Sequence, residues 1–217
     1  MKQIFLTILL SILLLGCSHQ NKMSASQSGL PVYNTADFTP AWPDDTAKTE
    51  ILPHYIPAFV FTDQNGETIT EKTFAHKIYV TDFFYTSCPG ICKTLSSNLA
   101  EVQQTFEKDS EVLILSHSVT PDFDTQARLK VYAKTFGAID HKWFMVRGNK
   151  DSVYTIARQA YFADEDLGLQ KNTADFLHTE NILLIDKQRR IRGIYKGTSK
   201  LQIADLIKDI QILKKEE

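Results

Sequence analysis

Two cysteines separated by three residues form the part of this 217-residue sequence best suited to chemistry. Cys88 and Cys92 enclose Pro89-Gly90-Ile91 and begin a stripe of apolar residues spaced three and four apart, which predicts one face of a helix with both cysteines at its N-terminal end. A thiol there has a lowered pKa, because the helix dipole and the free backbone amides favour the thiolate. Thiolates attack disulfides and bind soft metal ions, so we interpret the pair as reactive rather than structural.

The four-residue spacing is compatible with a metal site as well as with redox chemistry. Side chains at positions i and i+4 lie on one helix face, so both sulfurs can converge on one ion. Two thiolates suit Cu(I), whereas zinc usually takes four ligands and the sequence offers no further cysteine except Cys17, in the N-terminal export signal. Copper that cycles between Cu(I) and Cu(II) needs a third ligand, and an imidazole serves both states.

The N-terminus predicts export. Lys2 precedes an apolar run, Ile4–Leu15, that is shorter than the roughly 20 residues needed to span a bilayer and is typical of a secretion signal. The run ends in Leu14-Leu15-Gly16-Cys17, which is similar to a bacterial lipobox, whose cysteine is acylated and becomes the first residue. A secreted protein with a spare cysteine and an uncleaved membrane anchor are the alternatives. All three interpretations place the domain outside the cytoplasm.

Composition narrows the remaining functions. If Cys17 carries lipid, Cys88 and Cys92 are the only free pair, and outside the cytoplasm such a pair tends to oxidise. The disulfide would close a very small loop and add little stability, so a purely structural role is disfavoured. A formal charge of −2 and the lack of a basic cluster disfavour a nucleic-acid partner.

Strand and helix patterns alternate along the chain and predict an α/β domain with helices on both faces of a central sheet. The expected strands are 58–62, 67–70, 78–84, 112–115, 143–146, 181–185 and 191–195, and the apolar patterns of the expected helices begin at 88, 129, 153 and 203. We expect Asp122 or Asp124 to cap the second helix and Gly137 to end it. A cysteine pair that opens the helix after a strand is the thioredoxin-like pattern.

The chain divides into three predicted parts. Residues 1–16 are a lipoprotein signal peptide, and residues 17–50, rich in Ser, Gln, Thr, Asp and Pro, are a lipid-attached flexible tether. Residues 51–217 are the thioredoxin-like domain.

Four segments together resemble the Sco/SenC family of copper-binding proteins. They are the cysteine motif Tyr85–Cys92, the Pro-x-x-Asp-Thr segment within Val119–Thr125, the helix Tyr132–Gly137, and Phe176-Leu177-His178-Thr179, where the family has its histidine ligand. The similarity extends from about Ile56 to Ile212. Lys93 stands where the family usually has a second proline, and Thr179 stands where it usually has serine.

The resemblance implies a thioredoxin-like fold of three layers with a mixed sheet, and Cu(I) or Cu(II) held by Cys88, Cys92 and His178. It implies a metallochaperone rather than a turnover enzyme, one that assembles the dinuclear copper centre of cytochrome c oxidase. The alternative is a thiol–disulfide oxidoreductase that reduces the cysteines of that centre. The implied partners are the copper-bearing oxidase subunit and other copper chaperones or thiol reductants. With the lipid anchor at Cys17, the expected location is a membrane of the bacterial cell envelope, facing the periplasm.

Three side issues stay open in the sequence. His117 ends a predicted strand, so it is a candidate alternative ligand or a neighbour of the ligands, although a surface or capping histidine is favoured. Lys93 either helps to keep a thiolate ionised or points to solvent. The polar loop 163–175 is hypothesised to be mobile and to let His178 swing onto the metal; the alternative is a simple exposed insertion.

Overall fold

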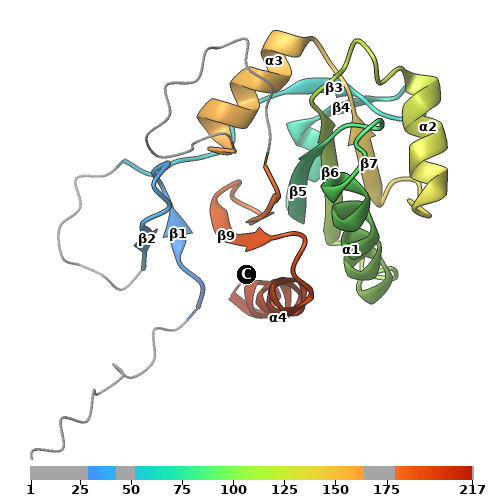
Figure 1. Ribbon diagram of the computed structural model, residues 1–217. Helices are drawn as coiled ribbons and strands as arrows, with labels where there is room; N and C mark the ends of the chain where they lie inside the picture. The colour runs from blue at the N-terminus through green and yellow to red at the C-terminus, as the bar shows by residue number, and fades with distance from the viewer. Residues whose placement is uncertain (1–28, 43–51, 164–178, 217) are drawn as a thin grey trace, which may run out of the picture.

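The computed structural model describes residues 29–42, 52–163 and 179–216, and its centre is a seven-stranded mixed sheet (Figure 1). The strand order is β2-β1-β9-β8-β5-β6-β7, with β5, β6 and β7 parallel and the other neighbouring pairs antiparallel. The strands are β1 (Val32–Tyr33), β2 (Pro40–Ala41), β5 (Ile78–Phe84), β6 (Val112–Ser118), β7 (Trp143–Val146), β8 (Asn181–Ile185) and β9 (Ile191–Lys196). A separate hairpin consists of β3 (Val60–Thr62) and β4 (Thr68–Thr70).

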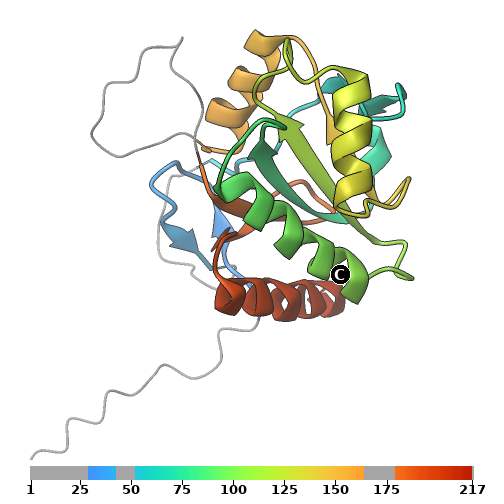
Figure 2. The same ribbon diagram turned by 45° about the vertical axis from the view of Figure 1, so that its right-hand side comes forward.

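Helices cover both faces of this sheet, as the sequence predicts. Helices α1 (Ile91–Thr105), α2 (Gln126–Thr135) and α4 (Lys200–Glu216) contribute to the core on one face, and Figure 2 shows α1 lying beside α4. The short helix η1 (Glu71–Phe74), α3 (Lys150–Thr155), the π-helical turn η2 (Ile156–Ala160) and the β3–β4 hairpin cover the other face. The fold is therefore the three-layer α/β architecture that was expected.

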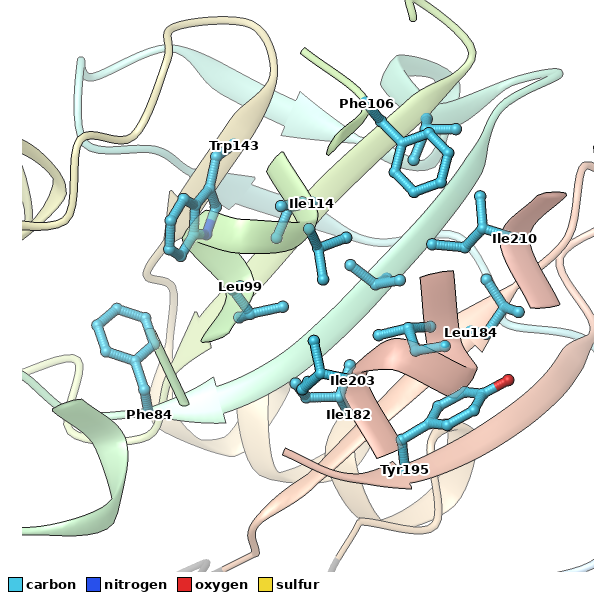
Figure 3. Close-up of a cluster of buried hydrophobic side chains, with 14 of the residues drawn as sticks. Phe84, Leu99, Phe106, Ile114, Trp143, Ile182, Leu184, Tyr195, Ile203 and Ile210 are labelled. Carbon is cyan, nitrogen blue, oxygen red and sulfur yellow. The ribbon is translucent and has the colours of Figure 1, made fainter. Parts of the chain in front are cut away.

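The two central strands are buried along their whole length, because both of their faces are covered. All seven residues of β5 and all seven of β6 are buried, which is typical of strands in a parallel arrangement. Alternate side chains enter two separate cores. The first includes Phe84, Leu99, Ile114 and Trp143 (Figure 3), and Phe83 and its neighbours enter the second.

Helix α1 begins later than the sequence pattern predicts. Its first residue is Ile91 and its N-cap is Gly90, so Cys88 lies in the loop after β5 and only Cys92 lies in the helix. Pro89 and Gly90 explain the difference, since proline lacks a backbone N–H and glycine has a low helix propensity. The prediction that both cysteines belong to the helix is wrong, although the apolar stripe from Cys92 onward is buried as expected.

Helix α2 has a different N-cap from the two that were predicted. The side chain of Thr125 caps it by accepting a hydrogen bond from the backbone N–H of Arg128, which leaves Asp122 and Asp124 without that role. Gly137 follows the end of the helix with φ +65°, a left-handed conformation that glycine adopts without strain. The predicted stop is confirmed.

Part of the predicted tether belongs to the folded domain. Residues 29–42 contain β1 and β2, and Tyr33 of β1 pairs with Ile191 of β9. The guanidinium of Arg192, which is 3% exposed, donates to the carbonyl oxygens of Leu30 and Pro31 at 2.7 and 2.9 Å. The boundary predicted at residue 50 is therefore wrong for this stretch, while residues 17–28 and 43–50 of the predicted tether lie outside the described residues. Within the described part of the chain, none of the helices has the length and hydropathy needed to cross a membrane.

Candidate metal centre

The two cysteines lie together where β5 ends and α1 begins. Each is a free thiol and is 4% exposed. Their sulfurs share a hydrogen bond, and the backbone N–H of Cys88 donates to the carbonyl of Tyr85 at 3.2 Å. The loop therefore brings the sulfurs together as predicted, although by a turn before the helix rather than by two helical positions.

The surroundings of the two thiols separate their acidities. Burial raises the pKa of Cys88, but hydrogen bonds from the Cys92 thiol, from the backbone N–H groups of Cys92 and Gly90 and from Tyr85 outweigh it, and the net pKa is lowered. Burial raises the pKa of Cys92, and its hydrogen bond to Cys88 raises it further. Of the two thiols, Cys88 therefore loses its proton first, and the thiolate is the form that attacks a disulfide or binds a soft metal ion.

Asp82 is a charged group beneath the cysteines that the sequence prediction missed. It lies within β5, is fully buried, and neither of its carboxylate oxygens has a hydrogen-bond partner among the described residues. Burial raises its pKa to about 7. Its negative charge also raises the pKa of Cys92. The only signal in the sequence was an acidic residue inside an otherwise apolar strand.

Asp124 is the second group whose contacts were not predicted. It is fully buried, and its carboxylate accepts hydrogen bonds from the backbone N–H and the hydroxyl of Thr86, two positions before Cys88. The hydroxyls of Ser118 and Thr120 donate to the same carboxylate at 2.6 and 3.0 Å. The sequence placed Asp124 in a family motif, but its contact with the cysteine loop spans 38 positions and was not visible there.

His117 is neither a surface residue nor a neighbour of the cysteines. It is fully buried on the opposite face of the sheet, in register with Phe83, and its ring stacks on that phenylalanine at 5.1 Å. Phe61 and Tyr161 also contact the ring. The favoured prediction of a capping or surface histidine is wrong, and the described position does not support a ligand role.

The remaining predicted site residues stand as follows. His178, Cys17 and residues 164–175 of the polar loop lie outside the described residues, while Lys93 is exposed. No group of three or more His, Cys, Asp or Glu residues suited to a metal appears in the part of the chain that is described. That part contributes two donors, the thiols of Cys88 and Cys92. Two adjacent soft sulfur donors in an apolar surrounding fit Cu(I) better than a harder ion.

A family model and a curated relative both match most of this chain. The SCO1/SenC family model matches residues 47–214. The SCO1 protein homolog of Bacillus subtilis is 21% identical over 162 residues, which cover 74% of this chain and 83% of that protein.

Solved structures of related proteins have the same fold. A SCO1/SenC family lipoprotein from Bacillus anthracis is 25% identical with a TM-score of 0.65, covering 75% of this chain and 96% of that one. ScoI of Bradyrhizobium japonicum, solved with copper bound, is 24% identical with a TM-score of 0.59, covering 73% and 99%. With the family model matched across most of its length, and with the cysteine pair where β5 meets α1, this chain belongs to the SCO1/SenC family.

Proposed function

We propose that this protein is a copper-binding assembly factor of cytochrome c oxidase, acting in the bacterial cell envelope. The observation that carries the proposal is the buried pair of free thiols, Cys88 and Cys92, hydrogen-bonded to each other in a chain of the SCO1/SenC family. Relatives solved with copper bound support copper as the ion.

In this proposal Cys88 and Cys92 hold the ion as thiolates, and His178 is the third ligand. Bound copper would supply a one-electron centre that can be handed to the oxidase. The chain's own residues prepare the site: Cys88 loses its proton easily, Cys92 loses it only on binding, and the apolar surroundings keep water from the sulfurs.

The proposed location of the protein is based on its N-terminal sequence. Acylation of Cys17 would hold the domain at a membrane, facing the periplasm. The proposed partners are the copper-bearing oxidase subunit and the copper chaperones or thiol reductants that load and reduce the cysteine pair.

Copper stoichiometry of the reduced protein tests this function. We expect about one Cu(I) per wild-type chain, and loss of most of it in Cys88→Ala, Cys92→Ala and His178→Ala. His141→Ala is the matched control, since His141 is exposed and distant in sequence from the cysteines. A reduced wild-type protein that retains no copper would exclude the proposal.

A second candidate function is thiol–disulfide exchange with the oxidase subunit. The unequal acidities of Cys88 and Cys92 favour it, because one thiolate attacks and the second thiol then resolves the mixed disulfide. The two functions differ in their need for His178. If a His178→Ala gene restores oxidase activity fully to cells that lack the protein, exchange is the function; if activity is lost while the cysteines still exchange, copper binding is.

A further inference from the structure

The side chain of Asp124, which precedes helix α2, forms hydrogen bonds with the cysteine loop. The residue belongs to the loop between β6 and α2, yet both hydrogen-bonding groups of Thr86 donate to it, the hydroxyl at 2.5 Å and the backbone N–H at 3.2 and 3.3 Å. Thr86 is the second residue of the loop that leads from β5 to Cys88.

The rest of the carboxylate is used to fix Asp124 itself. Ser118, the last residue of β6, and Thr120 donate their hydroxyls to it, and its backbone N–H donates to the carbonyl of Thr120 at 2.8 Å. The ends of β5 and β6 are joined at the same place, because the N–H of Val119 donates to the carbonyl of Phe84 at 2.9 Å. Asp124 is thus held by the sheet and in turn holds the cysteine loop.

The chemistry of this contact distinguishes it from an ordinary ion pair. Asp124 is fully buried, and no Lys or Arg of the described chain pairs with it. Its donors are one amide and three hydroxyls, each of which has a defined direction. Hydrogen bonds are directional, so the contact fixes the orientation of the loop as well as its distance from the sheet.

The geometry points to Asp124 as a positioning residue: by holding Thr86 it fixes the Cys88 loop, and through it the placement of the Cys88 sulfur against Cys92. In that placement the Cys88 sulfur is hydrogen-bonded to the Cys92 thiol and to the backbone N–H groups of Gly90 and Cys92. The expected change in copper affinity rests on the proposed function. The expected change in the relative reactivity of the two thiols rests on the structure alone.

The test uses the full-length, reduced protein with the substitution Asp124→Ala. We expect Cu(I) affinity, measured by competition with a chromophoric chelator, to fall about 10–100-fold, the usual effect of removing a group that orients a metal ligand. In metal-free protein we expect iodoacetamide to lose most of its preference for Cys88 over Cys92, as measured by peptide mass spectrometry. Asp124→Asn is expected to stay close to wild type, because its amide oxygen still accepts from Thr86 and its amide N–H groups can donate to the hydroxyls of Ser118 and Thr120.

Asp186→Asn is the matched control for general destabilisation. Asp186 is also a buried carboxylate that holds a turn, accepting from the backbone N–H groups of Gln188 and Arg190, but it lies at the β8–β9 turn. We expect this variant to lose stability and to keep the wild-type alkylation preference. If Asp124→Ala does not fold, Thr86→Val removes only the hydroxyl bond and must shift both readouts in the same direction.

Two outcomes would overturn the inference. One is a folded Asp124→Ala or Thr86→Val protein with wild-type affinity and alkylation preference; the other is an equal loss of that preference in Asp186→Asn. A wild-type protein that binds no copper would remove the proposed function, while the alkylation preference would still decide the role of Asp124.

Discussion

Cys88 and Cys92 lie side by side but differ in acidity, mainly because burial raises the pKa of Cys92 while hydrogen bonds from within the cysteine motif lower that of Cys88; Asp82 is the one contributor from outside the motif. The motif itself, with its spacing and the strand before it, was readable from the sequence. Asp82 was not, because only the fold shows that a residue in the middle of β5 points toward Cys92. His117 was misplaced for a similar reason: its position at a strand end was correct, but the face toward which it points is set by its register with Phe83.

Asp82→Asn is expected to stabilise the protein at neutral pH. In the unfolded chain this carboxyl ionises near its ordinary pKa of 3.8, whereas in the fold its pKa is about 7. The wild type therefore loses stability as pH rises from about 4 to 7, by on the order of 3 kcal/mol, and the variant does not. Urea unfolding at pH 4 and pH 7 measures this. An equal difference between variant and wild type at both pH values would show that Asp82 ionises normally in the fold.

His117→Phe is expected to remove an acid sensitivity of opposite sign. Burial lowers the pKa of His117 from 6.5 to about 3, so the unfolded chain binds a proton that the folded chain cannot. Wild-type stability should fall as pH decreases below about 6.5, by about 1.4 kcal/mol per pH unit. The total loss of stability should reach about 2 kcal/mol at pH 5. Melting temperatures of both proteins at pH 7.5 and pH 5 provide the comparison. If both proteins lose the same stability on acidification, another group is responsible.

At the scale of elements, long apolar or periodic segments were predictable and short ones were not. β5, β6 and the α1 stripe can be recognised from the local sequence. The two strands are apolar runs that are buried on both faces, and the stripe has helical spacing. The two-residue strands β1 and β2 have no such pattern, and they are held by Arg192, about 160 positions away. The predicted start of α1 was wrong because it relied on the spacing of apolar residues alone. Pro89 and Gly90 lie within that spacing, and both disfavour helix formation.

Arg192→Met is expected to release residues 29–42 from the sheet. The change removes the donors to Leu30 and Pro31 and the ion pairs of Arg192 with Asp186 and Glu216, while Asp186 keeps its ion pair with Arg190. We expect the free energy of unfolding to fall by about 2–3 kcal/mol, which is less than the usual cost of leaving a buried charge without its partner. Hydrogen exchange at Val32 and Tyr33 should rise with it.

Arg190→Met is the control for that substitution, since Arg190 pairs with the same carboxylate but its side chain is 29% exposed. It should change stability by about 1 kcal/mol or less. If both variants leave exchange in residues 29–42 at the wild-type rate, Arg192 does not hold this segment.

For the whole molecule, the site lies where two segments distant in sequence meet: the β5–α1 loop, which continues into the first turn of α1, and the β6–α2 loop. Binding an ion there should therefore stabilise the complete fold rather than one loop. We expect a Cu(I) concentration about 100 times the dissociation constant to add about 2.7 kcal/mol, which for a chain of this size raises the melting temperature by about 5–10 °C. Calorimetry of reduced protein with and without Cu(I) measures the shift.

The double variant Cys88→Ser/Cys92→Ser is the control, because serine keeps the size and loses the soft donor. It should melt at the same temperature with and without Cu(I). An equal rise in this variant would mean that the ion binds elsewhere on the protein.

The hydrogen bonds from Arg192 to Leu30 and Pro31 also determine at which end of the domain the N-terminal segment joins it. Tyr79, Ile185 and Ile191 lie in one row across the sheet, so the held segment is at the end where β5 starts, and Cys88 is beyond the end where β5 stops. Seven residues of strand span about 23 Å. In the proposed lipoprotein, the lipid on Cys17 would lie 13 positions before Leu30, a distance of at most about 45 Å. Because Arg192 holds Leu30 at the end of the domain away from the thiols, the length of the domain would add to that distance and increase the reach of the thiols above the membrane.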